Sequence, residues 1–337
     1  GIKRKMAPAT RRCSGSRKQA SLRAEAGTEA AMRVLVMGAG ALGGFFGARL
    51  QAAGHEVAFV ARGAHLAAMQ SDGLRVESPM GDLHLPTVVA VADPAEAPRP
   101  DVVLMMVKNR DLEAAAGALG PVLGPETAVM TAQNGVRAPA RLAEAIGPGR
   151  VIAGAVYMPA DIRAPGVIRH SSPSARLQAG VAPGGPAAAF DRLLAAVEEA
   201  GIAAERAEDV DALLWEKFVL LAPFAAITAL TRLDAGPIRD RPETRALWRQ
   251  AVEEAVAVGH AVCPGLPGGQ ADRVDAMLDA LPEAAHASML DDLTRGKPLE
   301  LEYLSGEIVR RGAAHGVPTP VHAMVRAALL PFVDGAP

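Results

Sequence analysis

The sequence predicts an α/β protein in which an N-terminal doubly wound parallel sheet precedes an all-α C-terminal domain. Three observations favour this fold class. Short apolar runs alternate with amphipathic stretches from Met32 to about Ala207, as in a sheet with helices on both faces. The runs are apolar almost throughout, which is typical of parallel strands buried on both faces. After Asp209 the strand pattern ends and only helical periodicity remains.

Each element is expected from its local pattern. The expected strands are Arg33–Met37, Glu56–Ala61, Val102–Val107, Ala128–Ala132, Val151–Tyr157, Val167–His170 and Arg176–Ala179. A helix over Ala187–Ala200 is ended by Gly201. The helices expected in the second domain are Leu213–Leu230, Arg241–Ala261, Gln270–Ala280, Ala284–Arg295 and Leu299–His315. The predicted domains therefore cover residues 32–207 and 208–337.

A glycine-rich turn follows the first expected strand and leads into a helix-like stretch. It has the spacing G-x-G-x-x-G and consists of Gly38, Ala39, Gly40, Ala41, Leu42 and Gly43. The first glycine can form the tight turn, the second lets the backbone approach a pyrophosphate, and the third allows helix and strand to pack closely. The N-terminus of the helix would face the phosphates. The segment therefore predicts a Rossmann-type dinucleotide site.

Arg62 directly follows the second expected strand, at the place where the choice between NAD and NADP is usually made. NAD-binding proteins carry an acid there, about 20 residues after the glycines, which bonds the ribose 2′-hydroxyl. A guanidinium instead pairs well with a 2′-phosphate. The alternative is a solvated arginine at a strand end. We expect NADPH as the cofactor.

The composition is that of a soluble globular protein, with 337 residues, 50% hydrophobic and 21% charged. The longest apolar run, 218–230, is too short for a bilayer and is interrupted by Pro223, so a buried core helix is expected. Two cysteines, Cys13 and Cys263, are too few for a disulfide framework, and no metal site is expected. A cytoplasmic setting follows from these observations.

Residues 1–31 differ from the rest, because eight Lys or Arg stand there against two acids. Disorder is expected. A basic arm could be a transit peptide or a nucleic-acid-binding tail, but Met32 lies directly before the first strand and favours a start assigned too far upstream, or a remnant that is not natural. Removing the arm's net +6 from the chain's −2 leaves −8 for the folded part, which argues against nonspecific nucleic-acid binding.

Polar residues at the carboxyl ends of parallel strands are the first candidates for chemistry, because ligands bind along that edge. Lys108 follows the expected strand Val102–Val107, and Asn134 follows Ala128–Ala132. Both lie where the nicotinamide half of a dinucleotide should run. The alternatives are a cation that caps a buried strand and, for Asn134-Gly135, a plain turn.

The second domain offers a lysine and two acids. Lys217 opens the most apolar helix, and withdrawal from water lowers the pKa of a lysine into the range that suits proton donation. The alternative is a lysine that snorkels at a helix edge. Glu300 and Glu302 would lie roughly 200° apart on an expected helix, so at most one of them faces the site.

These motifs, in this order, resemble the ketopantoate reductase (2-dehydropantoate 2-reductase) family over essentially all of Met32 to Pro320. The matching segments are 37–43, 107–108, 133–136, 214–218, 288–292, 300–306 and 315–320. The resemblance implies a Rossmann domain and a helical domain with the site between them. It implies hydride transfer from NADPH to a 2-oxo acid, such as the reduction of ketopantoate to pantoate in pantothenate biosynthesis.

The resemblance also assigns residues. It implies Lys217 as general acid, Glu300 as the group that holds the substrate hydroxyl, and Ser288 as the contact of the substrate carboxylate. Lys108 and Asn134 fall at the cofactor and ketone end of the cleft. The chain is expected to act as a monomer or homodimer without a nucleic-acid or membrane partner.

The departures from the family pattern fall in the substrate pocket. Family members carry Asn at the positions of Leu221, Ala225, Ala285 and Ser305. Leu221 and Ala225 follow Lys217 at helical spacing and are expected to contact the substrate, unless Pro223 bends the helix. Unpaired buried polar groups destabilise binding by about 1–3 kcal/mol each, so a more apolar 2-oxo acid than ketopantoate is expected.

Two rival functions remain open. One is a non-catalytic NADPH-binding redox sensor, suggested by the missing Asn residues. The other is a β-hydroxyacid dehydrogenase of the 6-phosphogluconate dehydrogenase type, although the Trp and Phe neighbours of Lys217 fit that family's glycine-rich lysine motif poorly.

Overall fold

The structure is a computed structural model of the chain, and it describes residues 31–336. The expected disorder of the basic arm, and the possible roles of that arm, fall on residues outside this range apart from Ala31. They stay predictions.

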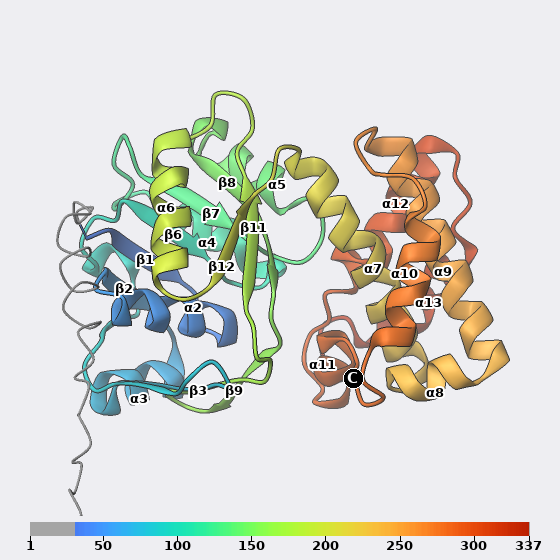
Figure 1. The fold of residues 1–337 in the computed structure, drawn as a ribbon, viewed down its shortest axis with the longest axis horizontal. Coiled ribbons are helices and arrows are strands. Elements are labelled where there is room, and N and C mark those ends of the chain that lie inside the picture. The colour runs from blue at the N-terminus through green and yellow to red at the C-terminus, as the bar shows by residue number, and fades with distance from the viewer. Residues whose placement is uncertain (1–30, 337) are drawn as a thin grey trace, which may run out of the picture. The chain divides into compact units, whose positions relative to one another are not determined.

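An eight-stranded sheet forms the N-terminal domain, in the order β12-β11-β8-β7-β6-β1-β2-β5 (Figure 1). Its strands are β1 (Arg33–Met37), β2 (Glu56–Val60), β5 (Val89–Val91), β6 (Val102–Met105), β7 (Ala128–Thr131), β8 (Val151–Tyr157), β11 (Arg176–Gly180) and β12 (Ala203–Arg206). From β5 to β8 all neighbours pair in parallel, as predicted. At the other edge the expected parallel pairing fails for one pair of strands, because β11 pairs antiparallel with β8 and parallel with β12.

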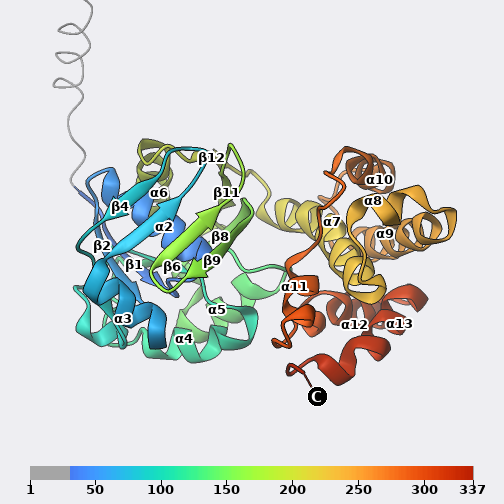
Figure 2. The same ribbon diagram turned by 90° about the horizontal axis from the view of Figure 1, so that it is seen from below.

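A second, four-stranded sheet has the order β4-β3-β10-β9. Its strands are β3 (Leu74–Glu77), β4 (Leu83–Leu85), β9 (Ala160–Ala164) and β10 (Val167–His170). The strand at β10 was expected in the main sheet, and this placement is wrong. It lies instead against helix α2 (Ala41–Ala52), where a Cβ on Gly44 would come within 2.9 Å of Ile168. The edge strands β4 and β9 of the small sheet lie beside the same helix (Figure 2).

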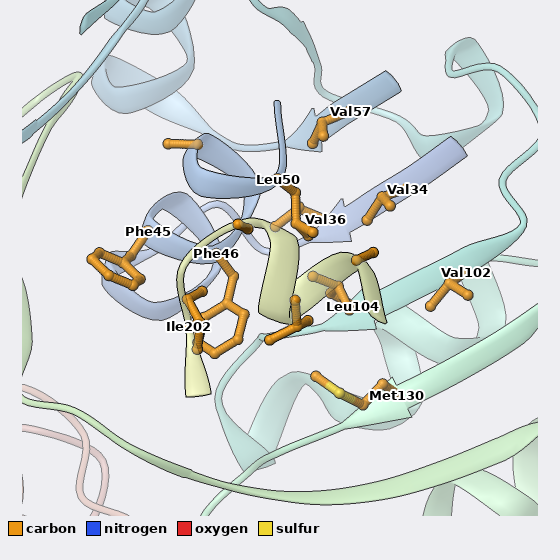
Figure 3. Close-up of a cluster of buried hydrophobic side chains, with 14 of the residues drawn as sticks. Val34, Val36, Phe45, Phe46, Leu50, Val57, Val102, Leu104, Met130 and Ile202 are labelled. Atoms are coloured by element: carbon orange, nitrogen blue, oxygen red, sulfur yellow. The ribbon is translucent and has the colours of Figure 1, made fainter. Parts of the chain in front are cut away.

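Both faces of the main sheet are buried. Val34 and Val36 pack toward α2 and α6 (Ala187–Glu199), with Phe46 and Leu50 among their neighbours (Figure 3). The alternate residues of β1 face the opposite side, in a core built with α4 (Leu112–Ala118) and α5 (Ala138–Ile146). This alternation is the reason for the continuous apolar character of the strand. Helix α3 (Gly63–Asp72) follows β2.

The C-terminal domain is all-helical, as predicted. Its helices are α7 (Val210–Thr231), α8 (Ala235–Asp240), α9 (Pro242–Val262), α10 (Gln270–Ala280), α11 (Ser288–Thr294), α12 (Ser305–His315) and α13 (Pro320–Leu329). Helix α7 begins where the Asp209 carboxylate accepts a hydrogen bond from the Ala212 amide at 2.9 Å. The division at residues 207 and 208 itself stays a prediction.

Two expected helices begin later than predicted. The backbone of 283–285 pairs with the start of α8 instead of continuing a helix, so α11 begins only at Ser288. The Leu299 amide bonds the Val333 carbonyl, and a short 3₁₀ turn, η4 (Leu301–Tyr303), precedes α12. Glu300 therefore lies outside any α-helix, and the expectation of two glutamates 200° apart on one helix is wrong.

By length and composition alone, α7 could cross a membrane, and it is the single such helix within residues 31–336. Helix α7 has 22 residues and continues through Pro223. The expectation of a run too short for a bilayer concerned residues 218–230, which are only part of this helix. Its side chains pack against α9, α11 and α13 in the core of the helical domain. This burial explains its composition.

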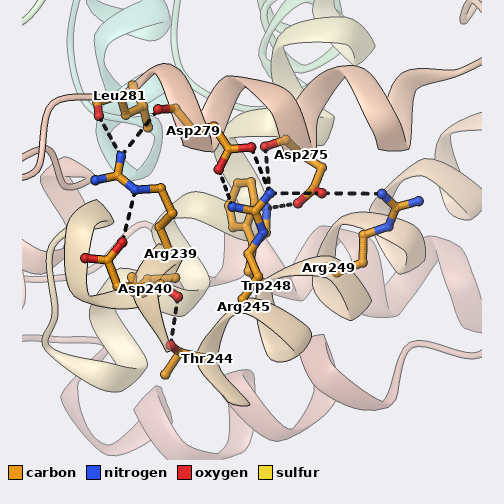
Figure 4. Close-up of polar contacts among 10 residues, drawn as sticks. Arg239, Asp240, Thr244, Arg245, Trp248, Arg249, Asp275, Asp279 and Leu281 are labelled. Carbon is orange, nitrogen blue, oxygen red and sulfur yellow. Dashed lines mark hydrogen bonds and ion pairs between the residues drawn. The ribbon is translucent and has the colours of Figure 1, made fainter. Parts of the chain in front are cut away.

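Ion pairs join α9 to α10 on the far side of that core (Figure 4). The Arg245 guanidinium lies 2.5 Å from an oxygen of Asp279 and 3.0 Å from one of Asp275. Asp275 also accepts a hydrogen bond at 3.1 Å from the indole of Trp248, a fully buried residue. These contacts link the two helices, both of which also contact α7.

Candidate active site

The glycine turn lies at the point where the strand order of the sheet reverses, between β1 and β6. Gly38 has φ +101°, and a Cβ there would lie 3.0 Å from the Val107 amide nitrogen. A Cβ on Gly43 would overlap the Gly38 carbonyl oxygen. Gly40 differs, because a Cβ there would meet no atom of residues 31–336 within 4 Å. The first and third glycines thus serve the turn and the packing, whereas the second adjoins open space.

Ala41 and Leu42 are the first residues of α2, and both are half-buried. No side chain in the described part of the chain caps this helix end, and its first N–H groups have no intrahelical carbonyl to bond. Donors that open onto free space at a helix N-terminus suit a phosphate. The residues therefore fit the phosphates of a dinucleotide.

Arg62 lies beside this turn. It follows β2, whose Val60 is the register partner of Met37 at the end of β1. Its side chain is exposed at the start of α3. Because the Arg62 guanidinium is exposed, it can contact a group bound near the turn without breaking a buried contact.

Lys108, Asn134 and Glu300 come together although they are distant in sequence. Lys108 follows β6, and its Nζ lies 3.7 Å from Glu300 Oε2 and 3.3 Å from Asp292 Oδ2. The Asn134 amide nitrogen lies 3.4 Å from the same Glu300 oxygen. Burial is the largest single effect on the pKa of Lys108 and lowers it, but Glu300 and Asp292 together outweigh burial and hold this pKa above its usual value. The cluster therefore keeps a cation and a carboxylate at the carboxyl edge of the sheet.

Gln133 forms hydrogen bonds to the strand end and the loop that carry Lys108. Its side-chain nitrogen donates to the carbonyls of Met105, at 2.8 Å, and Val107, at 3.1 Å. Gly135 has φ +95°, and a Cβ there would lie 3.0 Å from the Tyr303 carbonyl oxygen. The Asn134-Gly135 segment is therefore a place of close approach to the helical domain, and more than a plain turn.

Lys217 reaches the same edge from α7. Its Nζ donates to the Val156 carbonyl at 2.9 Å, near the carboxyl end of β8, and lies 5.4 Å from the centre of the Tyr157 ring. Burial lowers the pKa of Lys217 from its ordinary 10.5 to about 8, and the charge of Glu300 partly opposes this change. A lysine with this pKa is mostly protonated at pH 7 and can give up its proton readily.

The expected substrate contacts differ in position. Leu221 is half-buried one turn after Lys217. Ala225 is 1% exposed and belongs to the core of the helical domain, which leaves it almost no surface for a ligand. Ser288 is exposed at the first position of α11. Their contact with substrate stays a prediction.

Ser305 stands where the family has an Asn, and it is directed into the core. Its side chain is fully buried, and its hydroxyl lies 3.1 Å from Nδ1 of His322. Burial lowers the pKa of His322 to about 4, so this histidine is neutral at physiological pH. Ser305 and the neutral His322 therefore form a hydrogen-bonded pair inside the core.

A cavity of about 420 Å³ adjoins the Lys108–Glu300 cluster. It is lined by Lys108, Arg110, Asp292, Lys297, Pro298, Leu299, Glu300 and Tyr303. Sequence reasoning missed four residues that contact this cluster or its partners: Asn109, Arg141, Asp292 and Tyr303. Asn109 had a signal, because it directly follows Lys108 beyond the same strand; Arg141 had none, because it lies on an ordinary amphipathic helix.

The turn at the switch point and the lysine–carboxylate cluster beyond it are features of a Rossmann-type oxidoreductase with a helical second domain. The chain belongs to the ketopantoate reductase PanE/ApbA family. The family model for “Ketopantoate reductase PanE/ApbA” matches residues 34–184, and the model for its C-terminal part matches residues 209–331.

Individual relatives agree with this assignment. The chain is 33% identical over 321 residues to a 2-dehydropantoate 2-reductase of Mesorhizobium japonicum, covering 88% of this chain and 97% of that protein. It is similar to the crystal structure of a PanE/ApbA family ketopantoate reductase from Ralstonia eutropha, with a TM-score of 0.81, 33% identity and coverage of 89% and 98%. A D-mandelate dehydrogenase solved with NADH and anilino(oxo)acetate has the same fold, with a TM-score of 0.81, 19% identity and coverage of 89% and 98%.

Proposed function

We propose that this protein reduces a 2-oxo acid to the 2-hydroxy acid with NADPH, as a 2-dehydropantoate 2-reductase or a close variant of one. The observation that carries the proposal is Lys217, whose pKa is lowered by burial to about 8 while its charge is favoured by Glu300. Paired groups of this kind at the carboxyl edge of a Rossmann sheet are suited to acid catalysis.

The dinucleotide would be held by the glycine turn, with its phosphates at the N-terminal amides of α2 and its 2′-phosphate near Arg62. Lys108 and Asn134 would adjoin its nicotinamide end. When bound, the reduced nicotinamide supplies a hydride.

The protein's own groups would handle the proton and the orientation of the substrate. Lys217 gives a proton to the ketone oxygen as negative charge develops on it. Glu300 accepts a hydrogen bond from a hydroxyl of the substrate, and Ser288 donates to its carboxylate. Among residues 31–336 the Lys217 ammonium bonds a backbone carbonyl and faces a ring but forms no ion pair, so it can turn toward a ligand without breaking one.

The preference for NADPH rests on Arg62, and the choice of acid rests on the pocket. Leu221 offers no hydrogen bond, and the hydroxyl of Ser305 is already engaged by His322. Both differences favour a 2-oxo acid with a more apolar side chain than that of 2-dehydropantoate. The enzyme is proposed to work in the cytoplasm, as a monomer or homodimer.

The test is NADPH oxidation at 340 nm with 2-dehydropantoate, branched-chain 2-oxo acids and aryl 2-oxo acids. We expect turnover with at least one acid and a higher kcat/KM with NADPH than with NADH. Tight NADPH binding without turnover on any acid would instead support a non-catalytic NADPH-binding protein.

A further inference from the structure

Glu300 is held by a residue that the proposed mechanism does not use. Asn109 is 1% exposed, and its side-chain nitrogen donates to Glu300 Oε1 at 3.0 Å and to the Asn134 carbonyl at 2.7 Å. The Asn109 backbone amide lies 3.4 Å from the same Glu300 oxygen. Glu300 is itself only 8% exposed, so its Oε1 atom has buried donors whereas Oε2 faces Lys108 and Asn134 Nδ2 at longer range.

A second residue fixes which way the Asn109 amide points. Arg141 donates to Asn109 Oδ1 at 3.2 Å and to its backbone carbonyl at 2.8 Å. A carboxamide has a donor end and an acceptor end. Because Arg141 offers only donors, it binds the oxygen end, and the nitrogen end must face Glu300. Arg141 therefore selects the orientation in which Asn109 can bind a carboxylate.

Arg141 also contacts both domains. Its guanidinium pairs with Glu113 at 2.6 Å on the outer side, and it lies 4.9 Å from the centre of the Tyr303 ring. Tyr303 belongs to η4, the turn that directly follows Glu300. The contacts thus hold the Glu300 segment against the loop after β6 at two separate points.

We propose that Asn109, oriented by Arg141, is the positioning residue that fixes Oε1 of Glu300 and directs Oε2 toward the hydroxyl of the substrate. This inference rests on the proposed function, because it concerns the same carboxylate. It adds two residues to the site, neither of which touches the reacting atoms. A carboxylate that is held at one oxygen loses less conformational entropy when it binds a ligand with its other oxygen.

The kinetic test is a double-mutant cycle with the acid that the wild-type protein reduces fastest. Asn109→Ala removes a hydrogen bond to a charged group, and we expect kcat/KM to fall about 10- to 100-fold, chiefly through a higher KM. In a Glu300→Ala background the same substitution should change kcat/KM less than twofold, because nothing remains to be positioned. The Kd of NADPH should stay within twofold of the wild-type value.

Arg141 and Glu113 supply the matched variants. Arg141→Met should lower kcat/KM in the same way as Asn109→Ala. Arg141→Lys should recover part of the loss, because an ammonium group still donates hydrogen bonds but lacks the fork of the guanidinium. Glu113→Gln removes the charge of the outer partner of Arg141 and leaves both bonds to Asn109, so it should change kcat/KM less than twofold. Multiplicative effects of Asn109→Ala and Glu300→Ala, or an equal loss in Glu113→Gln, would overturn the proposal.

A readout without turnover separates this inference from the proposed function. In urea unfolding, Asn109→Ala and Glu300→Gln should be coupled, so that the double variant unfolds at a higher urea concentration than the sum of the single effects predicts. Absence of coupling refutes the contact. Coupling in a protein that reduces no 2-oxo acid overturns the positioning role and assigns Asn109 to the docking of the domains.

Discussion

The pH dependence of catalysis should follow the protonation of Lys217. Its pKa of about 8 lies below the ordinary value of 10.5, so the group is protonated below pH 8 and loses its proton as the pH rises through that value. About nine in ten molecules hold the proton at pH 7 and about one in ten at pH 9. A general acid must be protonated, so kcat/KM for reduction should be level between pH 6 and 7 and fall about tenfold per unit above pH 8.

Variants at two positions sharpen this prediction. Lys217→Ala should lower kcat by about 10² or more at pH 7, the usual contribution of a general acid. Glu300→Gln should move the midpoint of the pH profile below 8, because the charge of Glu300 favours protonated Lys217. The assay is initial-rate NADPH oxidation across the pH range, with NADPH binding measured at each pH as the control. A wild-type profile that stays level to pH 10, or a Lys217→Ala enzyme with the wild-type rate, would refute the assignment.

Three further predictions concern the cofactor site and the pocket. Arg62→Asp should raise the Kd of NADPH at least tenfold and change that of NADH much less; equal losses, measured by fluorescence titration, would mean that Arg62 serves the fold. Gly43→Ala should destabilise the protein by about 2–4 kcal/mol in urea unfolding, because its Cβ would overlap a backbone oxygen. Gly40→Ala should change the free energy of unfolding by no more than about 1 kcal/mol but should weaken cofactor binding. The reverse order of stabilities would contradict these roles. Leu221→Asn should improve kcat/KM for 2-dehydropantoate relative to an apolar 2-oxo acid. An unchanged preference in this variant would show that Leu221 does not line the pocket. Ala225→Asn should lower stability by about 1–3 kcal/mol, because its amide would be buried without partners.

The elements that could be predicted are those whose signal is local. The strand before the glycine turn is buried on both faces, so its apolar run is continuous and easy to recognise. Helix α10 begins and ends at the predicted residues, because the helical periodicity of the sequence spans the same residues as the helix. Lys217 could be singled out for a similar reason, since a charged residue within a strongly apolar helix is conspicuous.

The rest depended on contacts between distant segments. The strands of the small sheet are short, and those at its edges, β4 and β9, carry half-exposed residues. The predicted helix around Glu300 fails because the Leu299 amide bonds the Val333 carbonyl, a partner supplied by the C-terminal end of the chain. The Asn109–Glu300 bond joins residues 191 positions apart, and no spacing rule connects them.

In the proposed reaction a hydride passes from the nicotinamide to the carbonyl carbon of a 2-oxo acid. The most direct measurement uses NADPH with deuterium at C4 of the nicotinamide, prepared separately for each face of the ring, and mass spectrometry of the acid produced. We expect a 2-hydroxy acid that carries one deuterium at C2 from only one of the two labelled cofactors. A product without deuterium from either cofactor, or no product from any 2-oxo acid while NADPH is bound, would contradict it.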